Sequence, residues 1–368
     1  MSRGRKGKTL AGRGRVLRRD DASPEVVRRR VELPTPPPSV LPGRLEASLS
    51  ALNAVLGDYL KDRANGLEIE MQLHVNNRPV RCDREGLARA YPDASHRICL
   101  LVHGLGTHEG VWSFPADRAV SYGSLLQKDL GYTPCYVRYN SGLHISENGR
   151  SLAELLEALV RDHPVEVKEI AVLGYSMGGL VVRSACDVAA REGHGWVERV
   201  KRIVYIGAPH LGAPLEKIGN VVAWVLRTID VPHTKLVADV IDLRSSGIKD
   251  MRYANLAPED WQGFDPDVLL EDHRKAVPLA PRAAHHLVVG TLTGGERHVL
   301  TRLFGDAMVR VPSAAGRSRD GKRSPVFPQE NVRIFPGLGH VALAHDRAVY
   351  EQIRAWLGGE LFREEGAS

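Results

Sequence analysis

The segment Glu169 to Arg183, E-I-A-V-L-G-Y-S-M-G-G-L-V-V-R, constrains the fold of this chain more than any other. Its first half is an apolar run typical of a buried strand, and its second half is helical in pattern. Glycines stand two positions before and two positions after Ser176, where side chains would collide with the neighbouring strand and helix. The segment therefore predicts a strand, an outward-facing nucleophilic serine, and a helix whose first N–H groups favour an oxyanion.

Strands and helices alternate along most of the chain. A hairpin is expected around Asn76-Asn77. Apolar strands that alternate with helices indicate an α/β fold with a mostly parallel sheet and helices on both faces. Strands are predicted at 97–103, 134–139, 168–175, 200–207, 285–291 and 331–335, and helices at 117–130, 150–162, 177–192 and 345–357.

Four parts can be distinguished from composition and pattern. We expect a disordered basic tail with a Pro-rich linker over 1–40 and an amphipathic helix over 41–66. The α/β core should comprise 67–213 and 283–368. Between them, residues 214–282 break the α/β rhythm and predict an inserted helical cap over the crevice. Its apolar residues, Trp224 among them, would either contact an acyl chain or only dock the cap on the core.

The positive charge is concentrated at the N-terminus. Residues 1–31 hold eleven Arg or Lys and three Asp or Glu, so this part carries +8 while the whole chain carries +6. The tail could contact an anionic membrane face or a nucleic acid, or it could be solvated without a specific partner.

The sequence also allows expectations about the cellular location of the protein and the state of its cysteines. The N-terminus has no apolar segment typical of a secretion signal, and no apolar run approaches the roughly 18 to 20 residues of a membrane span. We therefore expect a cytoplasmic protein without a transmembrane segment. The four cysteines lie far apart in the chain and should be free thiols rather than disulfides or metal ligands.

A second loop is expected beside Ser176. The strand R-I-C-L-L-V ends in His103-Gly104-Leu105-Gly106, and the carboxyl ends of parallel strands meet at one crevice. The N–H groups of Leu105 and Met177 would then form an oxyanion hole. We expect His103, Gly104, Tyr175 and Trp224 to contribute to substrate binding.

A serine nucleophile needs a base and an acid. Among fifteen histidines, His340 lies in a glycine-rich loop after the last predicted strand, whereas its competitor His345 lies where the final helix should start. Asp306 precedes His340 and completes the chain order Ser, Asp, His. Asp250, Asp265 and Asp267 are alternatives for the acid, but they lie in the predicted cap.

Several motifs together resemble the α/β-hydrolase serine lipases and esterases, especially bacterial lipases and the inositol-deacylase-like group. They are V-H-G-L-G at 102–106, G-Y-S-M-G-G at 174–179, G-A-P-H-L-G-A-P at 207–214, G-D-A-M-V at 305–309 and G-H at 339–340. The resemblance implies a triad of Ser176, Asp306 and His340, with Leu105 and Met177 as oxyanion donors.

The sequence thus predicts a serine hydrolase that cleaves carboxylic esters with an apolar acyl group, with a small ester or lipid as substrate. Neither a metal nor an organic cofactor is expected. The alternatives are an acyltransferase or thioesterase with the same triad, and a membrane-associated or nucleic-acid-associated scaffold with a hydrolase fold.

Overall fold

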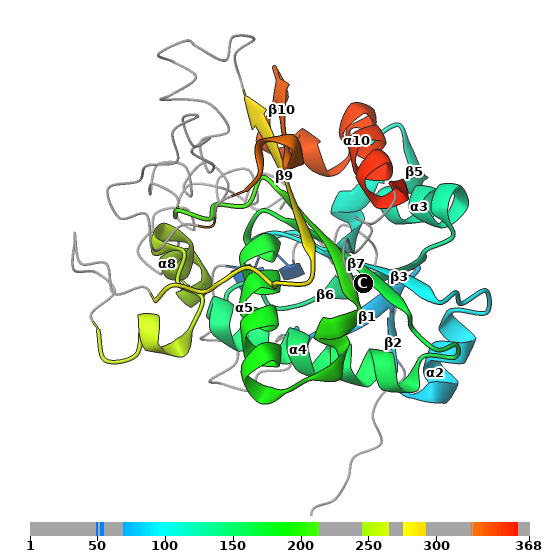
Figure 1. The fold of residues 1–368 in the computed structure, drawn as a ribbon, viewed down its shortest axis with the longest axis horizontal. Coiled ribbons are helices and arrows are strands. Elements are labelled where there is room, and N and C mark those ends of the chain that lie inside the picture. The colour runs from blue at the N-terminus through cyan, green and yellow to red at the C-terminus, as the bar shows by residue number, and fades with distance from the viewer. Residues whose placement is uncertain are drawn as a thin grey trace, which may run out of the picture. The chain divides into compact units, whose positions relative to one another are not determined.

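An eight-stranded sheet organises the computed structural model of the chain (Figure 1). The structure describes residues 49–50, 52–54, 69–212, 245–264, 275–291, 325 and 327–359, all within the unit Val40–Ser368. The strand order is β10-β9-β8-β7-β3-β6-β1-β2. The strands from β10 to β6 are parallel to their neighbours, while β1 pairs antiparallel with β6 and β2. The strand that leads to Ser176, β7, therefore lies centrally, between β3 and β8.

The strands of this sheet are β1 Gln72–Val75, β2 Arg78–Val80, β3 Arg97–Val102, β6 Thr133–Arg138, β7 Glu169–Tyr175, β8 Val200–Ile206, β9 Ala284–Thr291 and β10 Val332–Pro336. A separate hairpin consists of β4 Ser113–Phe114 and β5 Asp117–Ser121. The α-helices are α2 Arg84–Ala90, α3 Tyr122–Leu130, α4 Ile145–Asp162, α5 Met177–Glu192, α8 Ser246–Tyr253 and α10 Arg347–Gly358. Short 3-10 helices are η1 Glu109–Trp112, η2 Gly195–Arg199, η3 Pro258–Asp260, η4 Gln329–Asn331 and η5 His340–Ala344.

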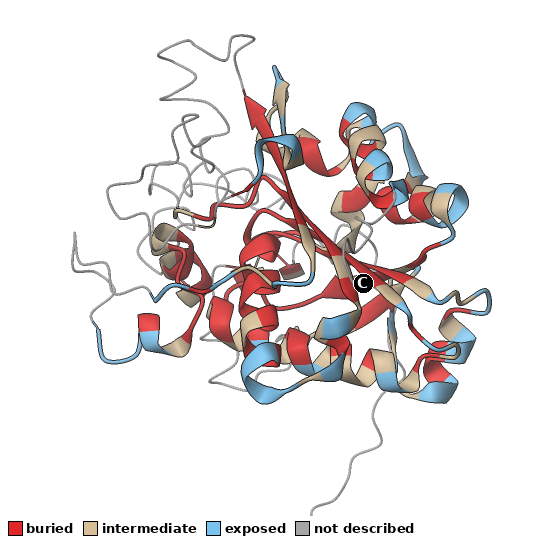
Figure 2. Cartoon of the chain, viewed as in Figure 1, coloured by how far each residue is buried: buried red, intermediate tan, exposed pale blue. Residues whose placement is uncertain are grey.

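The central strands are buried on both faces, as Figure 2 shows in red. Because side chains alternate along a strand, each strand supplies two hydrophobic clusters. In β7, Ile170 and Val172 face one cluster, and Ala171, Leu173 and Tyr175 face the other. The first cluster is shared with α4 and α5, and the second with α3, η5 and α10. Helices therefore cover both faces, which confirms the predicted fold class.

Most predicted elements are confirmed, and the differences have local causes. The predicted helix 117–130 is wrong over 117–121, where β5 pairs with β4, and α3 starts only after Ser121 caps it. The helix predicted at 150–162 starts earlier, at Ile145, and α2 was not predicted. The predicted Asn76-Asn77 turn is confirmed, since both residues have positive φ, as a tight hairpin requires.

Several predictions concern residues that the structure describes only in part or not at all. The tail and linker 1–40 lie outside the described residues, as do Trp224, Asp265, Asp267 and Asp306. Within the expected helix 41–66, residues 49–50 and 52–54 are described and helical. Of the expected cap 214–282, the structure describes 245–264 and 275–282. The domain boundaries therefore stay predictions.

Two predictions about the whole chain can be compared with the described part. In that part, no helix combines the length and the apolar character needed to cross a bilayer. All four cysteines are described and are free thiols, three of them buried, as the sequence predicted.

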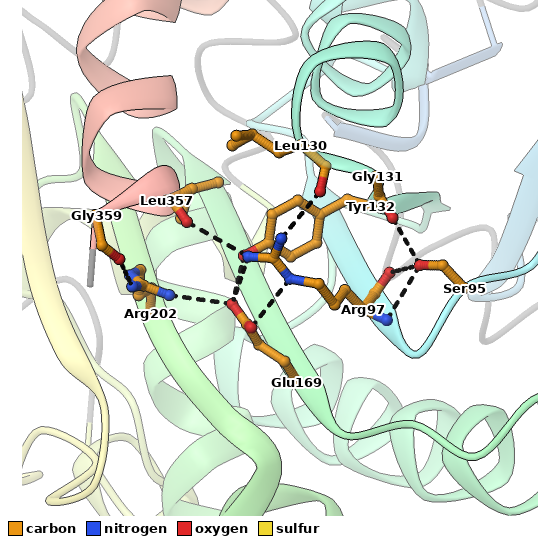
Figure 3. A network of polar contacts seen from close by, with 9 residues as sticks. All are labelled: Ser95, Arg97, Leu130, Gly131, Tyr132, Glu169, Arg202, Leu357 and Gly359. Atoms are coloured by element: carbon orange, nitrogen blue, oxygen red, sulfur yellow. Dashed lines mark hydrogen bonds and ion pairs between the residues drawn. The ribbon is translucent and has the colours of Figure 1, made fainter. Parts of the chain in front are cut away.

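A partly buried ion network joins the starts of three strands at the edge opposite Ser176 (Figure 3). The Glu169 carboxylate accepts hydrogen bonds from Arg97 Nε at 3.0 Å, Arg202 Nη1 at 3.0 Å and the Tyr132 hydroxyl at 2.5 Å. Both guanidinium groups also donate to carbonyl oxygens at the ends of α3 and α10, namely those of Leu130, Leu357 and Gly359. The network thereby connects the sheet to the helices of one face.

We predict that Glu169→Gln lowers the unfolding free energy by about 2 kcal/mol, because the buried Arg202 and the partly exposed Arg97 lose their counter-charge. Urea denaturation at neutral pH measures the change. Glu85→Gln is the control: its partner Arg89 lies at 2.6 Å, but both side chains are more than 60% exposed, so we expect less than about 0.5 kcal/mol. Equal losses in the two variants would contradict the prediction.

A second stability prediction concerns His286 of β9. Burial, and then the charge of Arg202, lower its pKa to about 4, and its ring stacks on Trp356 of α10 at 4.6 Å. The unfolded chain takes up this proton near pH 6.5, so the unfolded state binds more protons between about pH 6.5 and 4, and stability falls as pH falls through that window. Burial also lowers the pKa of His74 to about 4 and of His103 to about 3, with the same sign.

His286→Phe keeps a ring against Trp356 but cannot titrate. Between pH 7 and pH 5 the wild type should therefore lose about 1 to 2 kcal/mol more unfolding free energy than this variant does. Urea titrations at four pH values measure the two slopes. Parallel slopes would show that the protonation of His286 does not contribute to acid sensitivity.

Candidate active site

Ser176 occupies a strained turn between β7 and α5. Its backbone has φ 52° and ψ −124°, a conformation that residues with a Cβ rarely adopt. The turn is held by a hydrogen bond from Ser176 N to Ile206 O at 2.8 Å and by one from Gly179 N to Ser176 O at 3.0 Å. Such strain persists only where surrounding structure enforces it, and here two strands and a helix do so.

Close backbone packing requires the glycines on both sides of Ser176. A Cβ on Gly174 would lie 2.7 Å from Gly179 Cα, and a Cβ on Gly178 would lie 2.3 Å from His103 O. The start of α5 therefore abuts the carboxyl end of β3, as the motif predicts. A Cβ on Gly104 would lie 2.9 Å from Ser176 Cβ, so the loop after β3 passes directly beside the serine.

His103 holds this loop from within the core. Its ring is fully buried and stacks on Tyr139, with ring centroids 4.3 Å apart. The Tyr139 N–H donates to His103 Nε2 at 3.4 Å, so the proton resides on Nδ1, which donates to Gly104 O at 2.9 Å. Because burial lowers the pKa of His103 to about 3, the ring stays neutral and this tautomer persists at physiological pH.

The N–H groups of the loop are not equivalent. Gly104 N donates to Thr107 Oγ1 at 3.1 Å, and Gly106 N donates to Ser141 Oγ at 2.9 Å. Between them, the Leu105 N–H makes no hydrogen bond to any described residue. Met177 is the first residue of α5, where a backbone N–H has no intrahelical acceptor. The two predicted oxyanion donors are thus backbone N–H groups that the local structure leaves available.

The Ser176 side chain itself is enclosed. The residue is 1% exposed, and its Oγ has no hydrogen-bond partner among the described residues. A buried hydroxyl without a partner is costly unless the site uses it. Among the described residues, the hydroxyl of Ser176 therefore makes no structural hydrogen bond.

His340 lies against the residue that precedes the serine. It begins η5 after β10, and its ring stacks on Tyr175 with centroids 5.1 Å apart and planes at 30°. The Tyr175 hydroxyl also donates to His340 O at 3.3 Å. The competitor His345 instead has its Nδ1 3.3 Å from Val111 O, beside η1. Of the two histidines, His340 is the one in contact with the nucleophile turn.

The predicted acid of the triad, Asp306, lies outside the described residues. Among the alternatives, Asp250 of α8 is described and buried. Its carboxylate accepts hydrogen bonds from His144 Nδ1 at 3.0 Å and Ile145 N at 2.8 Å, at the start of α4. Burial raises the pKa of Asp250, and the contacts at α4 offset part of that increase. Asp250 therefore caps a helix and pairs with a different histidine.

The predicted substrate-binding residues have distinct surroundings. The backbone of Gly104 borders Ser176, whereas the side chains of His103 and Tyr175 are buried in packing contacts. Sequence reasoning did not identify Thr107 and Ser141, which hold the oxyanion loop, or the contact between Tyr175 and His340. A signal for the last existed: Tyr175 follows Ala171 and Leu173 in strand alternation, which assigns it to the sheet face that β10 and η5 complete.

Solved structures with a similar chain course include hydrolases from several organisms. A lipase from Bacillus licheniformis, in its mature form, has a TM-score of 0.40 and 14% identity, over 71% of this chain and 91% of its own. An esterase from Pyrococcus furiosus has a TM-score of 0.40 and 14% identity, over 72% and 81%. A thermophilic esterase from Thermogutta terrifontis has a TM-score of 0.38 and 14% identity, over 72% and 90%.

Among curated proteins, none matches the sequence significantly. A family profile does match: that of the alpha/beta hydrolase family, over residues 99–352, which span β3 to α10 and include Ser176 and His340. This match covers more than half of the chain and agrees with the strand order and the serine turn described above. The chain therefore belongs to the alpha/beta hydrolase family.

Proposed function

We propose that the protein is a serine hydrolase that cleaves carboxylic esters with an apolar acyl group through an acyl-enzyme. The observation that carries the proposal is the strained, buried Ser176 between the Gly104 loop and the Tyr175–His340 contact. In this proposal Ser176 is the nucleophile, His340 is the base, and Leu105 and Met177 supply the oxyanion donors. The motifs resemble those of bacterial lipases and of the inositol-deacylase-like group, which supports an ester as the substrate.

The proposed reaction has two halves. Ser176 Oγ attacks the ester carbonyl carbon while His340 accepts the hydroxyl proton, and the Leu105 and Met177 N–H groups stabilise the oxyanion. When the tetrahedral intermediate collapses, the carbon–oxygen bond to the alcohol breaks and His340 returns the proton to that alcohol. Water then attacks the acyl-enzyme by the same route and releases the acid and free Ser176. Asp306 is proposed to hold His340 during both halves.

The proposal can be tested with nitrophenyl esters from acetate to palmitate and purified full-length protein. Activity should rise with chain length from acetate if an apolar acyl site is present, and a serine-reactive phosphonate should remove it. Absence of turnover on every ester, together with absence of phosphonate labelling, would refute the hydrolase and favour the scaffold alternative. Labelling without ester turnover would instead direct the search to thioesters or acyl acceptors.

A further inference from the structure

Tyr175 lies between the Gly104 loop and His340, next to Ser176. It is the last residue of β7, is covalently joined to Ser176, and is 2% exposed. A Cβ on Gly104 would lie 3.2 Å from its Cδ1, so the ring borders the oxyanion loop. On another side the ring stacks on His340, and its hydroxyl reaches the His340 carbonyl. The backbone of Tyr175 is fixed by β7, so the ring is a rigid reference for all these groups.

The ring of Tyr175 is itself held in place. Trp112 of η1 meets it in an edge arrangement, with centroids 6.2 Å apart and planes at 71°. Trp112 is completely buried and also packs on Tyr122. An aromatic ring that is packed in this way loses little entropy when it holds a neighbour. The stack can therefore help to fix the orientation of the His340 imidazole.

We propose that Tyr175 is a positioning residue for His340 that also stabilises the protonated imidazole during turnover; this inference rests on the proposed function. The face of an aromatic ring carries partial negative charge and attracts a cation within about 6 Å of its centroid. The observed 5.1 Å stack meets that condition. The attraction is greater for the imidazolium that forms when His340 takes the serine proton than for a neutral imidazole, so it favours the transition state over the ground state, which raises kcat.

The pH dependence of kcat/KM distinguishes this role of Tyr175 from simple packing. If the ring stabilises the imidazolium, its removal makes the imidazole harder to protonate. The base then stays active at lower pH, and the acidic limb of the kcat/KM profile moves to lower pH, while the plateau of kcat falls. A ring that only fills space would change the plateau or the fold without moving the limb.

The test compares Tyr175→Leu with Tyr175→Phe. Tyr175→Leu removes the ring, and we expect kcat to fall about tenfold, KM to change little, and the acidic limb to move down by about half a pH unit. Tyr175→Phe keeps the ring face and removes the 3.3 Å hydrogen bond to His340 O, so it should stay within about threefold of wild type, with an unmoved limb. Phosphonate titration of Ser176 counts competent sites, so that partial unfolding does not count as lost turnover.

Tyr350→Leu is the matched control. Tyr350 is a fully buried tyrosine of the same hydrophobic cluster, on α10, and its ring neighbour is Tyr122 rather than His340. Its replacement should lower stability without moving the acidic limb. An independent measurement is the NMR titration of ¹³C-labelled histidine, with the His340 signal assigned from His340→Gln. Its midpoint should move to lower pH in Tyr175→Leu and stay in place in Tyr175→Phe.

The outcomes separate this inference from the proposed function. Suppose that phosphonate labels Ser176 in the wild type. If Tyr175→Leu then keeps the wild-type kcat and the wild-type acidic limb, the role of Tyr175 is refuted and the proposed hydrolase function stands. The same conclusion follows if Tyr350→Leu moves the acidic limb as far as Tyr175→Leu does. A loss in Tyr175→Phe as large as that in Tyr175→Leu would also refute it, because the ring face would not be the active feature. If the wild type is not labelled, the proposed function fails, and this inference fails with it.

Discussion

Ser176→Ala should lower ester turnover by about 10⁶-fold while the protein remains folded, because the proposed acyl-enzyme forms on the hydroxyl that this change removes. Stopped assays with high enzyme concentration measure the residual rate. Mass spectrometry after phosphonate treatment should find the adduct on Ser176 in the wild type and no adduct in the variant. An adduct on a different serine would contradict the assignment of the nucleophile.

Two further variants make this test specific. Ser184→Ala changes a buried serine on the same helix, whose Oγ donates to Leu256 O at 2.6 Å. It should cost about 1 kcal/mol of stability and leave turnover unchanged. Ser176→Gly should be as inactive as Ser176→Ala but more stable by about 1 kcal/mol or more, because glycine adopts φ 52° without strain. Equal stability of these two variants would argue against strain at the turn.

Asp306→Asn should lower turnover by about 10⁴-fold with little change in stability or substrate binding. In the proposed mechanism the carboxylate fixes the tautomer of His340 and supplies most of the compensation for its positive charge in the transition state, and Asn supplies neither. Steady-state kinetics on the best nitrophenyl ester separate kcat from KM, and thermal melting checks the fold.

Asp265→Asn and Asp267→Asn are the controls for the acid, because both belong to the predicted cap. Each should retain most of the wild-type turnover. If one of them proves inactive and Asp306→Asn retains activity, then the acid follows a different strand, and the predicted cap boundary at 282 is also wrong. Asp250→Asn is not an equivalent control, since its carboxylate caps α4 and its loss would destabilise the fold.

The predicted partners of the N-terminal tail stay predictions, because the tail lies outside the described residues. A net charge of +8 within 31 residues is compatible with contact to an anionic membrane or a nucleic acid. The cytoplasmic location is likewise a prediction. Neither bears on the chemistry at Ser176.

The sequence by itself determined the elements whose signals are local. The apolar run, the paired glycines and the helical pattern around Ser176 predicted β7, the turn and α5, with helix limits that agree with the structure. Strand limits were predicted within about one residue, because each buried parallel strand is one continuous apolar run between polar turns. The position of the His103–Gly106 loop was predictable for the same reason, since the loop directly follows the end of β3.

Only the tertiary structure decided which distant groups meet. Ser121 is a local N-cap signal for the start of α3, but residues 117–121 form a strand because β4 offers a partner. Tyr175 and His340 are 165 positions apart, and their contact depends on the order of β7, β8, β9 and β10 in the sheet. Asp250 was an alternative acid in the sequence, and packing against α4 made it a helix cap. A local sequence pattern reflects the interactions of a residue with its neighbours in the chain. Contacts across the sheet depend on the strand order, which the spacing of residues within one segment does not encode.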